Sequence, residues 1–275
     1  MSAAALSGAR VLDVPLTGLH TIGLAELTER ASLLTRIDRK YLLPRSDLDA
    51  VLADLDPGVR VLDINGVRSS AYESVYFDTP ELTSFLMAAH PRRRRFKIRT
   101  RTYVDSDECY LEVKTRGARS STVKDRIAYR PGDRRVLTQD GLEYIDETLA
   151  LSGIEGVDSS RLAPTLSTTY GRTTLYVPSS QSRATIDTNL GWHLPADGQL
   201  DRPDMVIVET KSGSRASTVD RVLWAHAHRP VAISKYATGL AALRADLPSN
   251  KWARVLRQRF DRPPQRSDRP ARSAA

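Results

Sequence analysis

Lysine and arginine occur at every second position in one short segment of this sequence. The stretch FKIRTRTY, residues 96–103, alternates Lys97, Arg99 and Arg101 with apolar or β-branched residues. Because successive side chains of a β-strand point to opposite faces of a sheet, this spacing predicts a strand with three cations on one face. Guanidinium and ammonium groups both bind phosphate oxygens. The pattern indicates a strand that could bind a phosphorylated ligand, although a strand with one solvated face shows the same alternation.

Charged residues alternate in the same way along other predicted strands. The cations that share these predicted faces are Lys40, Lys97, Arg99, Arg101, Lys114, Arg172, Arg183 and Lys211, and the carboxylates are Asp38, Glu112, Asp187 and Glu209. If the strands closed into a barrel with these faces inward, the lumen would need a polyanionic ligand, because unpaired buried cations are very costly. The carboxylates could pair with the cations or hold a divalent cation that bridges phosphates.

Most of the chain is predicted to form β-strands, with a few helices. The predicted strands span residues 35–43, 72–79, 93–104, 108–116, 121–130, 163–178, 182–195 and 204–213. The predicted helices span residues 46–55, 133–153, 217–228, 234–247 and about 249–260. This order predicts one α+β domain, a mainly antiparallel eight-stranded β-barrel with flanking helices. We expect an N-terminal lead-in at residues 1–29, this domain at 30–248, and a basic helix with a disordered tail at 249–275.

The net charge of +8 is concentrated near the C-terminus. Residues 249–275 carry eight Lys/Arg and two Asp, which leaves a net charge of only +2 for the rest of the chain. A basic site in the body of the protein must therefore be local. The single cysteine, Cys109, excludes an intramolecular disulfide and fits a reducing cytosol. No signal peptide and no run of about 18 apolar residues occurs, so we expect a cytoplasmic protein that is at most peripheral to a membrane.

Eight sequence blocks occur in an order that resembles a known family. They read RIDRKYLLP, YESVYFDTPEL, FKIRTRTY, YLEVKTRG, TTYGRTTLY, RATIDTNL, VIVETKSG and ISKYATGL. They cover roughly residues 30–245 and resemble the VTC domain, the polyphosphate polymerase domain of the vacuolar transporter chaperone family, within the triphosphate tunnel (CYTH-like) superfamily. The resemblance implies a β-tunnel that binds ATP and polyphosphate with Mn²⁺ or Mg²⁺. In eukaryotic members this domain transfers the γ-phosphate of ATP to a growing polyphosphate chain.

The resemblance also implies roles for individual residues. The expected catalytic residues, which would hold the triphosphate in line for transfer, are Arg99, Arg101, Lys114 and Arg172. The residues expected to bind the rest of the substrate are Lys40, Lys97, Arg183, Lys211 and Lys235, of which Lys97 is included for its shared face alone. Glu209 is the expected metal ligand, with Glu112 and Asp187 as further candidates.

The sequence departs from the wider superfamily in one block. Arg36 and Asp38 stand where many members carry the two glutamates of an E-x-E-x-K pattern, which favours the polymerase branch over a simple triphosphatase. Ala232 replaces a lysine that some polymerases carry. Two alternatives stay open: a tripolyphosphatase or nucleoside triphosphatase of the same fold, and a non-catalytic polyphosphate-binding module recruited to a membrane protein. Nucleic acid is a disfavoured ligand, because few aromatic residues interleave the basic strands.

Overall fold

The computed structural model describes residues 16, 18–31, 37–90, 92, 94–116 and 122–261. The predicted tail beyond residue 261 and most of the predicted lead-in lie outside these described residues. Within the described ranges, no helix is both long and apolar enough to cross a membrane.

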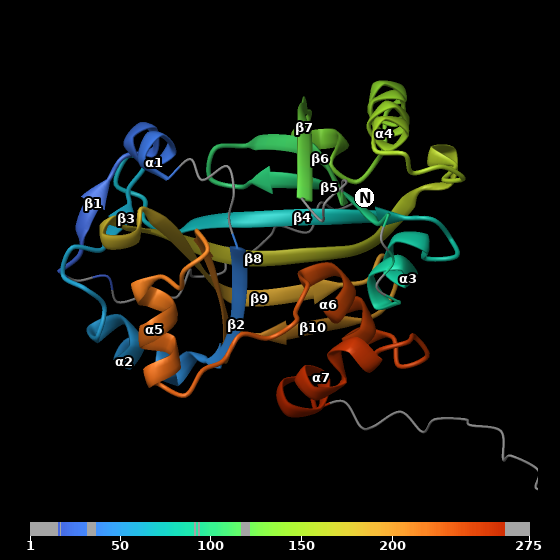
Figure 1. Cartoon of the computed structure of the whole chain (residues 1–275). Helices are drawn as coiled ribbons and strands as arrows, with labels where there is room; N and C mark the ends of the chain where they lie inside the picture. The colour runs from blue at the N-terminus through green and yellow to red at the C-terminus, as the bar shows by residue number, and fades with distance from the viewer. Residues whose placement is uncertain are drawn as a thin grey trace, which may run out of the picture.

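One large, mainly antiparallel sheet organises the chain (Figure 1). Its hydrogen-bonded path runs through β2 (Ile37–Pro44), β11 (Met205–Ser212), β9 (Ser182–His193), β8 (Ala163–Val177), β4 (Ser70–Asp78), β5 (Phe96–Tyr103), β6 (Glu108–Arg116) and β7 (Thr122–Tyr129). Short strands extend it: β1 (His20–Ile22) pairs with β3 (Arg60–Leu62), β3 with β8, and β10 (Gln199–Arg202) with β9. The predicted α+β architecture with flanking helices is confirmed.

The path of paired strands ends at β2 and β7, so in the described part of the chain the sheet does not close into the predicted barrel. The sheet coils strongly, and β2 runs across β8 and β9 in Figure 1. Lys40 on β2 and Lys124 on β7 lie on the same face of the sheet.

The strand register places the alternating cations on one face, which we call the basic face. Arg99 on β5 lies opposite Tyr76 on β4 and Glu112 on β6, while Lys97 lies opposite Lys114. Residues at the intervening positions, such as Ile98, point to the other face and are fully buried. The period of two that separates cations from apolar residues in the sequence therefore separates the two faces of the sheet.

Helices cover the apolar face in two places. On one half of the sheet, α2 (Leu48–Ala53) and α5 (Thr218–Ala225) pack against apolar residues of β2, β9 and β11. On the other half, α4 (Gln139–Leu151) packs Ile145 and Leu149 against apolar residues of β4, β5 and β6. The short helix α1 (Leu24–Arg30) packs Leu27 beside β1 and β8. Figure 1 shows α4 well separated from α2 and α5.

A third group of helices packs at one end of the basic face. Tyr236 and Leu240 of α6 (Lys235–Leu243) contact a cluster that contains Leu42 of β2 and Ile207 of β11. Leu42 and Ile207 lie two positions from Lys40 and Glu209 on the same face. α3 (Thr83–Ala89) and α7 (Ala253–Arg259) join this cluster from outside. The packing of α6 brings Lys235, its first residue, beside the charged strands.

Candidate functional site

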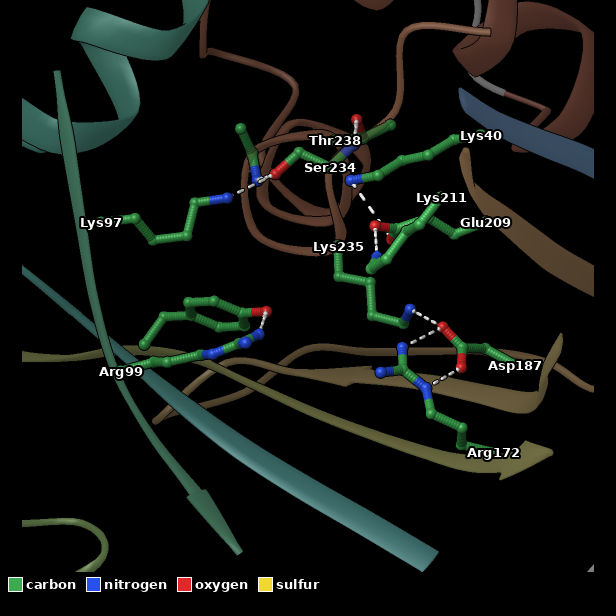
Figure 2. Close-up of polar contacts among 12 residues, drawn as sticks. Lys40, Lys97, Arg99, Arg172, Asp187, Glu209, Lys211, Ser234, Lys235 and Thr238 are labelled. Atoms are coloured by element: carbon green, nitrogen blue, oxygen red, sulfur yellow. Dashed lines mark hydrogen bonds and ion pairs between the residues drawn. The ribbon is translucent and has the colours of Figure 1, made fainter. Parts of the chain in front are cut away.

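The basic face gathers the predicted cations from separate strands. They are Lys40 on β2, Lys97, Arg99 and Arg101 on β5, Lys114 on β6, Arg172 on β8, Arg183 on β9, Lys211 on β11 and, from α6, Lys235. Figure 2 shows several of these side chains converging on shared carboxylates. The contacts divide into two clusters around fully buried carboxylates and one cluster around a partly exposed carboxylate.

The first cluster surrounds Glu112, whose side chain is fully buried. One of its oxygens accepts hydrogen bonds from Arg99 Nε at 2.8 Å and Arg99 Nη2 at 2.6 Å. Lys124 Nζ lies 2.7 Å and Arg101 Nη1 3.8 Å from the other oxygen. Burial alone would raise the pKa of the Glu112 carboxyl, but the charges of Arg99, Arg101 and Lys124 lower it strongly. Glu112 is therefore an ionised counter-ion that orients the arginines.

The second cluster surrounds Asp187, which is also fully buried. Arg172 binds it in a bidentate manner, with Nε 2.6 Å and Nη2 2.7 Å from the two carboxylate oxygens. Lys235 Nζ reaches the same carboxylate from α6 (Figure 2). Burial opposes ionisation, yet Arg172 and Lys235 lower the pKa of Asp187 to about 2. A bidentate contact fixes the plane of a guanidinium, so Arg172 is held in one orientation.

The third cluster surrounds Glu209, whose side chain keeps 16% of its surface exposed. It forms an ion pair with Lys211 on its own strand and lies 3.8 Å from Lys40 on β2. Burial opposes ionisation, but Lys40 and Lys211 hold the pKa of Glu209 well below its usual range. Glu209 is the most accessible of the three carboxylates that were predicted as metal ligands.

Two lysines on the basic face have no carboxylate partner among the described residues. Lys97 Nζ donates a hydrogen bond, 2.9 Å long, to Oγ of Ser234, which is the N-cap residue of α6. Burial, followed by the charges of Lys40 and Lys114, holds the pKa of Lys97 well below the usual lysine range. Burial and the charge of Arg99 likewise lower the pKa of Lys114 to about 7, against a smaller opposing effect of Glu209. Burial and the neighbouring cations both disfavour the charged form of these lysines, so an anionic ligand beside them would stabilise that form.

The side chains that could act as metal ligands limit how a divalent cation could bind. The described residues contain no group of three Asp, Glu, His or Cys side chains close enough to hold a metal ion. Glu112 and Asp187 are fully buried and already neutralised by arginine and lysine, so they do not fit as ligands. Glu209 is also paired with lysines, but 16% of its side chain is exposed. It fits, because Mg²⁺ is commonly held by one or two accessible carboxylates together with phosphate oxygens and water.

The structure adds residues that the sequence reasoning left out. Lys124 lies on β7, in the predicted strand 121–130, whose charged residues show the same alternation and could have revealed it. Tyrosine rings also support the cations. Arg172 Cζ lies 5.1 Å and Lys235 Nζ 4.4 Å from the centre of the Tyr170 ring. Tyr170 occurs two positions before Arg172, on the same face, and this spacing was the available signal.

The chain matches one family model and several solved structures. The family model of the VTC domain matches residues 35–244. No curated protein matches the chain significantly. Among solved structures, a putative adenylyl cyclase from Hippeastrum, described as having a dominant triphosphatase activity, is 13% identical with a TM-score of 0.49, covering 78% of this chain and 98% of its own. A conserved hypothetical protein from Pyrococcus furiosus is 14% identical with a TM-score of 0.36, covering 70% of this chain and 88% of its own.

Proposed function

This chain belongs to the VTC domain family, and we propose that it transfers the γ-phosphate of ATP to the end of a polyphosphate chain bound along its basic face. Family membership supports an enzyme that acts on polyphosphate-related substrates. The observation that carries the proposal is the excess of buried positive charge around Lys97 and Lys114, which have no carboxylate partner in the described part of the chain. A chain of phosphates supplies the missing negative charge.

Buried carboxylates hold the arginines ready for a ligand. Phosphoryl transfer depends mainly on positioning and on neutralising charge, so side chains that are already oriented lower the cost of reaching the transition state. Glu112 fixes Arg99, and Asp187 fixes Arg172. Each guanidinium has five N–H donors, and its carboxylate uses only part of them. Arg99 and Arg172, with Arg101 and Lys114, are the residues that we propose hold the transferred phosphate.

The remaining cations extend this binding surface. We propose that Lys40, Lys97, Arg183, Lys211 and Lys235 bind the other phosphates of the donor and the acceptor. The acceptor is the terminal phosphate of a polyphosphate chain, and its oxygens are already ionised, so the reaction needs no strong general base. Glu209 would hold Mn²⁺ or Mg²⁺ together with phosphate oxygens, and the ion would neutralise charge on the transferred group.

The test is incubation of the purified protein with ATP and Mn²⁺, followed by gel analysis of polyphosphate. We expect a ladder of long chains, which Arg99→Ala and Arg172→Ala abolish. Arg60→Ala is a matched control, since Arg60 is a partly buried arginine that pairs with Glu26 of α1 and takes no part in the three carboxylate clusters. Release of orthophosphate without longer chains would overturn the polymerase in favour of a hydrolase. Glu209→Gln should remove turnover and retain polyphosphate binding.

A further inference from the structure

Several buried polar atoms on the basic face have no hydrogen-bond partner among the described residues. Four of them are Ser74 Oγ, Thr168 Oγ1, Tyr170 Oη and Arg101 Nε. The residues that carry the three hydroxyls are almost completely buried, with 1% of the surface of Ser74, 1% of Thr168 and 4% of Tyr170 exposed. A buried hydroxyl without a partner costs roughly 1–3 kcal/mol. Native proteins rarely leave several such groups together without a ligand or water that satisfies them.

These four groups are neighbours in the sheet. Ser74 on β4 lies directly opposite Arg101 on β5 and directly opposite Thr168 on β8. Side chains at opposed positions of antiparallel strands have Cβ atoms about 4.5–5.5 Å apart. Tyr170 is the next residue of β8 on the same face and lies opposite Tyr72 of β4. Three adjacent strands therefore contribute one donor cluster, which we define as Ser74, Arg101, Thr168 and Tyr170.

Positive charge surrounds the donor cluster. Arg101 Cζ lies 5.8 Å from the centre of the Tyr72 ring, and Lys235 Nζ and Arg172 Cζ lie over the Tyr170 ring. Burial alone would raise the pKa of the Tyr170 hydroxyl, but Arg101, Arg172 and Lys235 lower it. A hydroxyl in this field is a stronger hydrogen-bond donor, and an anionic acceptor gains from both the donor and the cations.

We propose that the donor cluster binds one phosphoryl group of the phosphate chain and so fixes the register of that chain on the basic face. The inference rests on the proposed function, because it concerns the same ligand. Three hydroxyls and one guanidinium N–H match the oxygens of a single tetrahedral phosphoryl group. The hydroxyls add directional hydrogen bonds without adding charge, and so they select a position along the chain that a row of cations alone does not define.

The experiment removes each hydroxyl while keeping the shape of its side chain, with Ser74→Ala, Thr168→Val and Tyr170→Phe. Thr173→Val is the matched control. Thr173 lies on β8 as well, is 1% exposed, and its Oγ1 also lacks a partner in the described structure, but it faces the apolar side opposite Ile186. Calorimetry measures binding of inorganic tripolyphosphate and of ATP, and thermal unfolding measures the stability of the ligand-free proteins.

We expect each of the three variants to bind tripolyphosphate about tenfold more weakly or worse, since a hydrogen bond to a charged group is worth about 1.5–3 kcal/mol. Their unfolding temperatures should equal or exceed that of the wild type, because an unsatisfied group has been removed from the ligand-free protein. Thr173→Val should bind like the wild type. An equal loss for ATP places the γ-phosphate in the donor cluster, whereas a loss for tripolyphosphate alone places the inorganic chain there.

Two results would overturn the inference. Wild-type affinity in all three variants would show that the donor cluster does not contact the ligand, while the proposed function would stand. Weaker binding that is matched by Thr173→Val would show a general effect of altering these strands. If the wild-type protein bound neither ligand, the proposed function and the inference would both fail.

Discussion

Binding of polyphosphate should be accompanied by proton uptake at Lys114. Burial and the neighbouring Arg99 lower the pKa of this lysine to about 7, so much of it is neutral in the ligand-free protein at physiological pH. A polyanion placed beside it favours the charged ammonium and raises the pKa again. The ligand therefore binds best to the protonated lysine, and affinity should fall as the pH rises above 7.

The size of the effect follows from the pKa. A group with a pKa of about 7 is about 10% neutral at pH 6, about half neutral at pH 7 and about 90% neutral at pH 8. If the ligand protonates Lys114 fully, binding takes up about 0.1, 0.5 and 0.9 proton at these three pH values. Well above pH 7, this single group weakens binding by up to about tenfold per pH unit.

Calorimetric titration with tripolyphosphate in buffers of different ionisation enthalpy measures the proton uptake. The matched variant is Lys114→Arg, because arginine remains charged at every pH of the experiment. Protons exchanged by the ligand itself contribute equally to both proteins and cancel in the difference. We expect the wild type to take up about 0.9 proton more than Lys114→Arg at pH 8 and about 0.1 more at pH 6. Equal uptake by the two proteins at pH 8 would refute this reasoning.

Three further perturbations test how the site is held together. Glu112→Gln should lower the free energy of unfolding by about 3 kcal/mol, because it leaves Arg99 and Lys124 beside a neutral amide. Urea denaturation measures this loss, and an equal loss in Glu209→Gln would contradict the assignment of Glu112 as the buried counter-ion. Asp187 has a depressed pKa of about 2, so its contribution to stability is complete above about pH 4 and is lost as the pH falls toward 2. Acid unfolding of Asp187→Asn should lack this pH-dependent loss. An acid-unfolding profile equal to that of the wild type would contradict this role of Asp187. Tyr236→Phe should cost about 2 kcal/mol, because the Tyr236 hydroxyl donates to the buried Asp78 carboxylate. Hydrogen exchange should then speed up in α6 first, and a uniform change across the sheet would argue against this role.

The alternation of residue types predicted which residues share a face of the sheet, but not which charged side chains pair with one another. In residues 96–103 the period of two correctly separates Lys97, Arg99 and Arg101 from the buried residues between them. The strand ranges follow the same rule, since each strand needs an apolar set on one side. Local pattern and elementary sheet geometry are sufficient for this part of the fold.

The pairing of charges depends on register and topology, which the local pattern does not contain. Glu112 meets Arg99 across 13 residues of sequence, and Asp187 meets Lys235 across 48. From sequence, these carboxylates were candidate metal ligands, whereas in the structure both are fully buried and paired with cations. The open seam between β2 and β7 also depends on how far the whole sheet coils. No single strand encodes that property.

The most direct test of the account is whether the basic face holds a chain of phosphates. We predict that calorimetry of the wild-type protein with tripolyphosphate shows one saturable site, and that the double variant Arg99→Ala, Lys114→Ala shows no binding while it remains folded by circular dichroism. A double variant that binds as tightly as the wild type, or a wild-type protein that does not bind at all, would contradict the central claim.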